Sequence, residues 1–191
     1  MFARAGVEVT ATDRPDDTHG WAGVGQYGGA KEALFYPHIL DRQLFEERVN
    51  FEFCDMKAIP EGRQEYDFCW SCCAFEHLGD LRSGLDFVVD SVERMLKVGG
   101  VACHTTELNL SSDETTAETD RYVLYRRRDL IELSDRLSRR GHTVEPLRLE
   151  SGGLLPDFLV DLPPYRGNPH LKLRIGEHVS TSVGLVIRRG P

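Results

Sequence analysis

The chain has 191 residues, of which 40% are hydrophobic and 28% charged, as in an ordinary globular protein with room for one α/β domain. Its formal net charge of −8 argues against a nucleic-acid partner, which would require a basic surface. No apolar run reaches ~18 residues, so no membrane association through a spanning helix is expected. No signal-peptide pattern follows Met1, and we therefore expect a cytoplasmic protein.

Taken in chain order, the sequence alternates strand patterns with helical ones. The segments with a strand pattern are 7–13, 49–55, 66–71, 101–107, 142–149 and 181–187. The segments with a helical pattern are 2–6 (a last turn ended by glycine), 31–48, 81–95 and 129–140. We also expect a lid-like loop over 109–125 and a long connection over 151–170. This alternation predicts one α/β domain over 1–191, with a Rossmann-like, mostly parallel sheet and helices on both faces.

The cysteines offer a weaker signal. Residues 69–73 contain a C-x-x-C pattern, which can mark a redox pair or half of a zinc site. No second pair of ligands follows at zinc-site spacing. We therefore interpret these cysteines as small, reduced strand residues, and we assign no metal ligand.

Polar residues stand where the predicted strands end. In parallel α/β sheets, ligands bind at the carboxyl ends of the strands, so residues 13, 55, 71–77 and 104–107 should lie along one rim. An acid in this position commonly accepts hydrogen bonds from the ribose hydroxyls of a nucleotide. Asp13 fits that role, and Asp55 repeats the pattern at the next strand end. The alternative for Asp13 is a structural cap in the turn before Pro15.

Two further motifs point to a family. After the third strand comes Ala74-Phe75-Glu76-His77-Leu78, and before the fourth comes Met95-Leu96-Lys97-Val98-Gly99-Gly100-Val101. Together with the strands ending at Asp13 and Asp55, these segments resemble the class I S-adenosylmethionine-dependent methyltransferases over roughly residues 1 to 108. Farther along the chain, only the order of strands is similar.

The resemblance implies a set of cofactor contacts. S-adenosylmethionine would be the cofactor, with Asp13 on its ribose and Asp55 and Met56 on its adenine. Ser71 would line the methionine side, and Glu76 and His77 would open the following helix beside it.

The resemblance also implies a segment that this sequence lacks. The family begins with a strand and a glycine-rich cofactor loop, and residues 2–6 match only the end of the helix that follows them. We expect these parts to lie upstream of Met1, or another segment or chain to take their place. This N-terminally truncated chain is then expected to bind the cofactor weakly or not at all.

A glycine pattern offers a competing interpretation. Residues 23–28 fit G-x-G-x-x-G, which would suggest a nicotinamide-dependent oxidoreductase. The pattern begins about ten residues after Asp13, too late for the tight turn that this motif requires. We interpret it as a loop that folds over the site.

The segment His104-Thr105-Thr106-Glu107 is the candidate for acid–base chemistry, with His77 as a third catalytic candidate. Methyl transfer to a hydroxyl or amine requires removal of a proton, and histidine titrates near neutral pH. We expect His104 to be the base and Glu107 to orient it or the acceptor. One alternative is a divalent metal held by histidine and carboxylate ligands. In another, His104 hydrogen-bonds within the sheet and Glu107 caps the loop.

The sequence therefore predicts S-adenosylmethionine-dependent methyl transfer to a small-molecule or glycan-like acceptor. The alternatives are a nicotinamide-dependent oxidoreductase and a noncatalytic Rossmann-like binding module. The sequence is also compatible with a homodimer.

Overall fold

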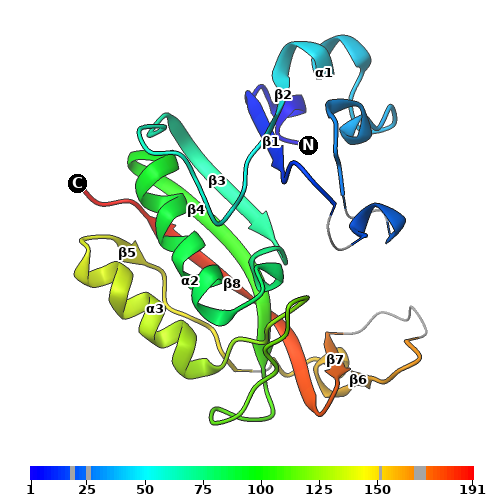
Figure 1. Cartoon of the computed structure of the whole chain (residues 1–191), viewed down its shortest axis with the longest axis vertical. Helices are drawn as coiled ribbons and strands as arrows, with labels where there is room; N and C mark the ends of the chain where they lie inside the picture. Colours follow the sequence, from blue (N-terminus) through cyan, green and yellow to red (C-terminus); the bar gives the residue numbers. More distant parts are fainter. Residues whose placement is uncertain (18–19, 25–26, 151, 166–170) are drawn as a thin grey trace. The chain divides into compact units, whose positions relative to one another are not determined.

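A computed structural model describes residues 1–17, 20–24, 27–150, 152–165 and 171–191. The chain divides into two compact units, Met1–Ala58 and Ile59–Pro191, which are described separately below (Figure 1). Whether they form a single domain stays a prediction. No helix among the described residues is both long enough and apolar enough to cross a bilayer.

The first unit is built on two parallel strands, β1 (Val9–Asp13) and β2 (Val49–Phe53), which pair from Val9↔Val49 to Asp13↔Phe53. The α-helix α1 (Arg42–Arg48) begins where the Asp41 carboxylate accepts a hydrogen bond from the Leu44 N–H at 2.9 Å. Three short 3₁₀ turns complete it: Ala3–Ala5, Trp21–Val24 and Lys31–Leu34. Its buried core consists of Ala3, Leu40, Phe45 and Val49.

The second unit contains a six-stranded sheet and two α-helices. The strands are β3 (Tyr66–Cys72), β4 (Leu96–Asn109), β5 (Thr143–Val144), β6 (Val160–Asp161), β7 (Lys172–Ile175) and β8 (His178–Arg188). Their order is β3-β4-β8-β7-β6, with β5 also paired to β8. The β3–β4 and β6–β7 pairs are parallel and the other pairs antiparallel. The helices are α2 (Leu81–Asp90), which continues as a π-helical turn over Ser91–Met95, and α3 (Arg127–Arg139). Short 3₁₀ turns lie at Phe75–His77 and Leu155–Phe158.

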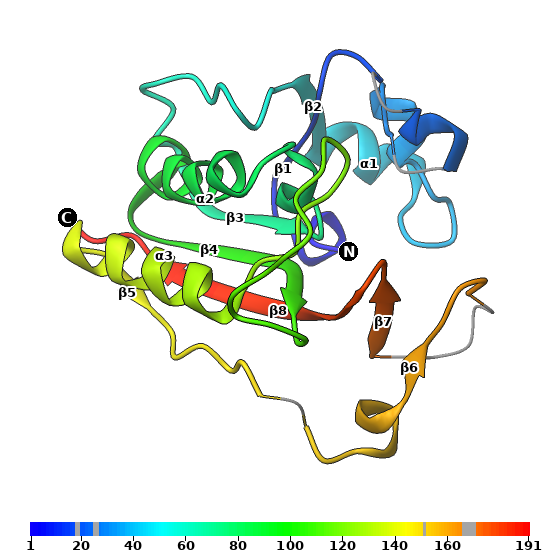
Figure 2. The same ribbon diagram turned by 60° about the horizontal axis from the view of Figure 1, so that its bottom comes forward.

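The two faces of this sheet differ in how far they are covered. In Figure 1, α2 lies in front of β3 and β4, and in Figure 2, α3 lies in front of β8. Side chains alternate between the faces of a strand. Along β4, Ala102, His104, Thr106 and Leu108 are buried, while the residues between them are half-buried. The second face includes Trp70 and Val186, which are 45% and 38% exposed and which both pair with Cys103.

The predicted Rossmann-like α/β fold is confirmed, with strands and helices in the expected order. The sheet of the second unit is mixed rather than mostly parallel, because β8 pairs antiparallel with β4, β5 and β7, and α2 and α3 both cover the same face of it. The strands ending at Asp13 and in the Ser71 region lie in separate sheets, and β3 pairs only with β4 among the described strands.

Three local predictions differ from the structure. The strand expected over 142–149 is reduced to β5, since Pro146 has no N–H to donate to a ladder. The strand β7 was not expected. Gly99 and Gly100 do not end the helix but lie within β4, where Gly99 has a φ of +84° and its N–H donates to the Arg189 carbonyl at 2.9 Å.

Candidate active site at the carboxyl ends of β3 and β4

The chain leaves β3 through a turn centred on Cys73. This residue has a φ of +44°, a left-handed conformation that is uncommon outside glycine. The turn is held because the Cys73 N–H donates to both the carbonyl and the Oγ1 of Thr105, each at 3.0 Å. Two residues later the 3₁₀ turn Phe75–His77 begins and leads to α2, where Asp80 accepts from the Ser83 N–H at 2.7 Å. The polar residues of this connection are therefore fixed against the end of β4.

Glu76 is buried at this junction, with 1% of its surface exposed. The Thr106 hydroxyl donates to Oε2 at 3.0 Å, and the Val123 N–H donates to the Glu76 carbonyl at 2.8 Å. The other carboxylate oxygen, Oε1, has no hydrogen-bond partner in the described part of the chain. Burial raises the pKa of Glu76 to about 7. Near neutral pH this carboxyl group can therefore act as either acid or base.

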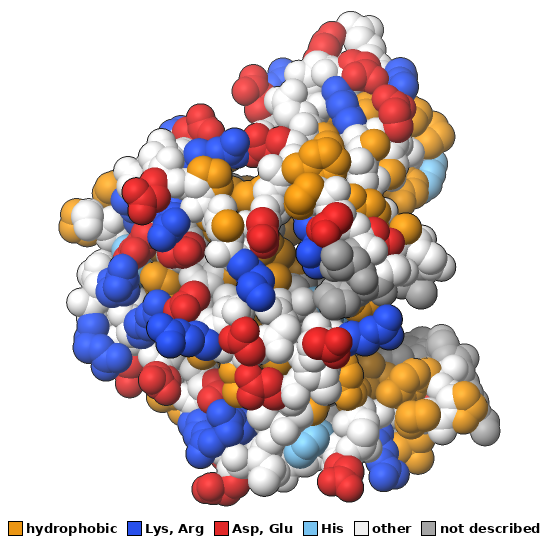
Figure 3. Space-filling view, viewed as in Figure 1, with side chains coloured by type: hydrophobic (Ala, Val, Ile, Leu, Met, Phe, Trp, Pro, Cys, Tyr) orange, Lys and Arg blue, Asp and Glu red, His pale blue; other side chains and the backbone are white. Residues whose placement is uncertain are grey.

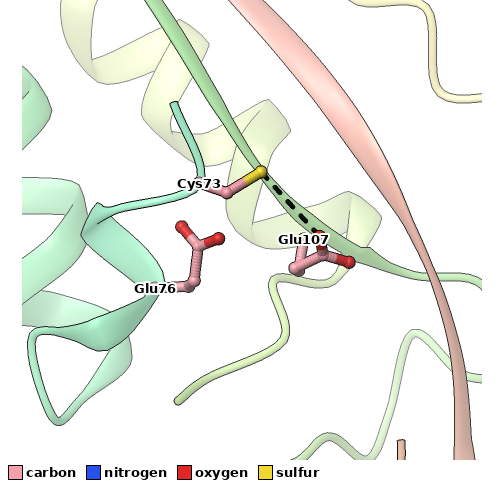
Figure 4. Close-up of side chains that lie close together, drawn as sticks. All are labelled: Cys73, Glu76 and Glu107. Atoms are coloured by element: carbon pink, nitrogen blue, oxygen red, sulfur yellow. Dashed lines mark hydrogen bonds between the residues drawn. The ribbon is translucent and has the colours of Figure 1, made fainter. Parts of the chain in front are cut away.

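Glu107 lies on the face of β4 opposite to Thr106 and is half-buried. Its Oε2 accepts a hydrogen bond from the Ser180 hydroxyl and its Oε1 one from the Ser182 hydroxyl at 3.3 Å, so strand β8 holds it in place. The Cys73 thiol also approaches Oε1 at 3.9 Å. Figure 4 shows Cys73, Glu76 and Glu107 directed toward one another, and one ligand atom of each lies within 4.8 Å of the others.

Glu107 also opens onto a cavity of about 330 Å³ in the second unit. The charged residues that line the cavity are Glu107, Arg148, Glu150, Asp157 and Lys172. Acidic and basic side chains therefore line the cavity together, which suits it to binding a polar small molecule. Figure 3 shows a similar mixture of acidic and basic side chains over the face of the molecule that it presents.

His104 occupies a different environment from Glu107. It is 1% exposed, with Nδ1 2.8 Å from the Ser71 hydroxyl and Nε2 3.0 Å from the Ser91 hydroxyl. Ser91 donates its single proton to the Val88 carbonyl at 2.8 Å, so Nε2 must donate to Ser91 and Nδ1 must accept from Ser71. Burial lowers the pKa of His104 to about 4, and the ring is neutral at pH 7.

The remaining predicted site residues have local partners. His77 is half-buried, and its Nδ1 donates to the Arg121 carbonyl at 2.7 Å. In the first unit, the Asp13 carboxylate accepts from the backbone N–H of Arg14 at 2.8 Å and of Gly28 at 2.7 Å. These contacts tie the carboxylate to the backbone of the loop that follows β1, and the ribose role of Asp13 stays a prediction. Gly28 ends the glycine pattern 23–28, of which residues 25 and 26 lie outside the described part of the chain.

Asp55 and Met56 follow β2. The Asp55 side chain is exposed and accepts from the Lys57 N–H at 2.9 Å, and Met56 is half-buried. With Asp13 they belong to the first unit, whereas Ser71, Glu76, His77, His104 and Glu107 belong to the second.

Within the second unit, the structure brings Ser71 to His104 and Glu76 to Glu107. It also adds residues that sequence reasoning missed: Cys73, Ser180 and Ser182. The one signal for Cys73 was its position directly after a strand end, which it shares with its neighbours. The serines of β8 carry no local signal, since their approach to Glu107 depends on strand pairing.

Comparison with known proteins places this arrangement in a recognised fold. No protein-family model and no curated protein sequence matches the chain. Solved structures do match. Geranyl diphosphate C-methyltransferase from Streptomyces coelicolor A3(2), solved with Mg²⁺, geranyl diphosphate and S-adenosyl-L-homocysteine, has a TM-score of 0.57 and 14% identity. That match covers 98% of this chain and 65% of the other, so the chain spans less than two thirds of its length.

Two further structures show the same likeness. The [4+2]-cyclase SpnF has a TM-score of 0.55 and 13% identity, with coverage of 99% of this chain and 68% of the other. The S-adenosylmethionine-dependent methyltransferase SibL has a TM-score of 0.53 and 14% identity, covering 99% of this chain and 46% of the other. The chain therefore has the fold of the class I S-adenosylmethionine-dependent methyltransferases. None of these three is a nicotinamide enzyme, and the oxidoreductase alternative is not favoured.

Proposed function

We propose that the protein transfers a methyl group from S-adenosylmethionine to a small-molecule acceptor. The observation that carries the proposal is the combination of a class I methyltransferase fold with a carboxylate, Glu107, that lines a polar cavity at the carboxyl end of β4. In α/β folds this end of the sheet is where ligands bind. The similar enzyme from Streptomyces coelicolor, whose name gives geranyl diphosphate as its substrate, supports a small-molecule acceptor.

For the cofactor, we retain the contacts that the sequence suggested. Asp13 would bind the ribose, Asp55 and Met56 the adenine, and Ser71 and Glu76 the methionine side. Asp13 already accepts two backbone hydrogen bonds. An ionised carboxylate has about four acceptor sites, so lone pairs remain for two hydroxyls.

For the acceptor, the geometry favours Glu107 as the base. It is half-buried, lines the cavity and is oriented by two serine hydroxyls. His104 has both ring nitrogens engaged and is buried on the other face of β4, so we assign it a positioning role: its Nδ1 orients the hydroxyl of Ser71. His77, which precedes α2, is a candidate contact to the acceptor. Methyl transfer itself requires an in-line approach of the acceptor to the sulfonium carbon, which a shaped cavity can provide.

The fold is also compatible with one competing function. SpnF has this fold and is named as a cyclase, so the fold alone does not specify methyl transfer. A binding module without catalytic activity is the corresponding interpretation for this chain, and cofactor binding separates the two.

The test is calorimetric titration of the whole chain with S-adenosylhomocysteine. In keeping with the weak affinity that the sequence suggests, we expect weak but saturable binding, which falls at least about tenfold further in Asp13→Asn, a loss of ~1.4 kcal/mol. The matched control is Asp16→Asn, because Asp16 is an exposed acid that pairs only with Arg14 in the described contacts. A folded chain that binds no S-adenosylhomocysteine would contradict the proposal, and equal binding by both variants would contradict the role of Asp13.

A further inference from the structure

The cluster of Cys73, Glu76 and Glu107 has a property that methyl transfer does not require. Two carboxylates and a thiol converge within 4.8 Å, and no ion pair joins Lys or Arg to either carboxylate among the described residues. Like charges at this separation repel unless a proton or a cation lies between them. The cluster itself contains no positive charge, so a proton or a bound cation would relieve this repulsion.

An independent observation points to a ligand at the same place. Glu76 is 1% exposed, yet its Oε1 has no hydrogen-bond partner among the described residues. Buried carboxylate oxygens are almost always paired, and each exception calls for an explanation. Figure 4 shows the Glu76 carboxylate directed toward Cys73 and Glu107 rather than away from them. An unpaired, buried acceptor thus faces two further ligand groups.

The donor set selects the kind of ion. Mg²⁺ and Ca²⁺ prefer oxygen ligands alone, whereas a thiolate favours a softer ion such as Zn²⁺. Zinc binds cysteine sulfur at about 2.3 Å and carboxylate oxygen at about 2.0–2.2 Å. Ligands of a tetrahedral ion at these lengths lie roughly 3.3–3.8 Å apart, so small side-chain rotations from the present positions would suffice.

The surroundings resemble those of a metal site as well. Thr106 fixes the second oxygen of Glu76, while Ser180 and Ser182 fix the carboxylate of Glu107. Hydrogen bonds of this kind orient the ligands in metalloproteins. Because Glu107 also lines the cavity, a fourth coordination position on that side would be open to water or to a bound molecule.

We propose that Cys73, Glu76 and Glu107 form a three-ligand Zn²⁺ site with one open coordination position. Binding displaces any proton from the thiol and from Glu76, and the ion supplies the positive charge that the cluster lacks. The proposal concerns metal binding alone and does not depend on methyl transfer. With the ion bound, Glu107 and Glu76 act as ligands rather than as acceptor base and cofactor contact, so the metal-bound chain is a different state from the one that transfers a methyl group.

The experiment uses Co²⁺ as a spectroscopic probe and Zn²⁺ as a competitor, with the whole chain. We expect Co²⁺ to produce a thiolate-to-cobalt charge-transfer band, and one equivalent of Zn²⁺ to abolish it. Cys73→Ser should remove the band and weaken Zn²⁺ binding at least about 100-fold, because loss of an outer-shell partner alone costs about 10–100-fold. Glu76→Gln and Glu107→Gln should each weaken it about tenfold or more.

The neighbouring cysteine provides the control. Cys72 is exposed and lies one residue away, so Cys72→Ser should leave the band and the affinity unchanged. A second measurement needs no variant: Zn²⁺ should slow alkylation of Cys73, located by mass spectrometry, and not that of Cys72. The proposal would be overturned if no charge-transfer band appears, or if Cys73→Ser and Cys72→Ser lose the band and the affinity equally. Equal protection of Cys73 and Cys72 from alkylation by Zn²⁺ would also overturn it.

Discussion

The two faces of strand β4 use the same kinds of residues in opposite ways. On the face covered by α2 and α3, His104 is buried with both ring nitrogens paired to serines. On the other face, Glu107 is half-buried and lines a cavity. These residues are three positions apart and look alike in the sequence as polar groups near a strand end. The burial of each face, rather than residue type, separates a group that holds the structure from one that can meet a ligand.

The largest expected difference in stability is between substitutions at two adjacent residues of β8. Leu185 is 1% exposed on the covered face, and Val186 is 38% exposed on the other. Leu185→Ala should lower the free energy of unfolding by ~3 kcal/mol, because it leaves a cavity in a packed layer, and Val186→Ala by less than ~1 kcal/mol. Urea denaturation of the two variants measures both values. Similar losses would show that the second face is as tightly packed as the first.

A smaller effect is expected from filling space on the covered side. A Cβ at Gly84 of α2 would lie 1.8 Å from the Tyr125 hydroxyl oxygen and 2.7 Å from the Phe75 carbonyl oxygen. Gly84→Ala should therefore lower the unfolding free energy by ~2 kcal/mol, since the neighbours must move apart. The control is Gly184→Ala on the other face, where a Cβ would meet nothing within 4 Å. Thermal melts of both variants test the difference. If Gly84→Ala leaves the melting temperature unchanged, α2 is free to shift.

Removing the hydroxyl of Ser91, beside His104, should lower the free energy of unfolding less than Leu185→Ala or Gly84→Ala. Ser91→Ala removes the acceptor of the Nε2–H of a buried ring, and leaving that donor unpaired costs ~1.5 kcal/mol. Ser182 is exposed on the other face, so Ser182→Ala should cost less than ~0.5 kcal/mol. Chemical denaturation at pH 7 compares them. A larger loss in Ser182→Ala would reverse the assignment of the two faces.

The smallest effect depends on pH and concerns the junction between α2 and α3. Glu93 accepts from Arg140 Nε at 2.5 Å and Nη2 at 2.6 Å and from His142 at 3.3 Å. Chiefly through the Arg140 hydrogen bonds, the pKa of Glu93 falls to about 2. Because the folded pKa is below the unfolded value of 4.5, the stabilisation is present above pH 4.5 and is lost as pH falls toward 2.

Glu93→Gln should accordingly lower the unfolding free energy by ~1 kcal/mol at pH 7 and have little effect near pH 2. Denaturation curves at several pH values give the comparison with the unchanged chain. A difference that grows as the pH falls would contradict the sign.

Much of the fold follows from local patterns in the sequence. Alternation along 7–13 and 101–107 and the periodicity of 129–140 predicted β1, β4 and α3 correctly. The pattern was weaker for β7, where lysine and arginine occupy two of four positions (172 and 174). A strand of that length is established by pairing with β8 rather than by its own residues.

The candidate site was less predictable, because its contacts join distant parts of the chain. Whether His104 is accessible depends on Ser71 and Ser91, which lie on β3 and after α2. The position of Cys73 depends on a left-handed backbone conformation that no local pattern marked. Strand ends could be recognised from the sequence, but the partners of each side chain could not, since they come from segments that pair only in the folded sheet.

The place of β8 in the sheet bears on how the protein is made. This strand lies between β4 and β7, and the pairing of Val101 with Arg188 joins segments that are far apart in the sequence. During synthesis, β4 leaves the ribosome long before β8 exists, and one edge of β4 stays unpaired until then. The sheet that carries Glu107 therefore closes by a long-range pairing, of the kind that slows folding and leaves strand edges exposed to aggregation.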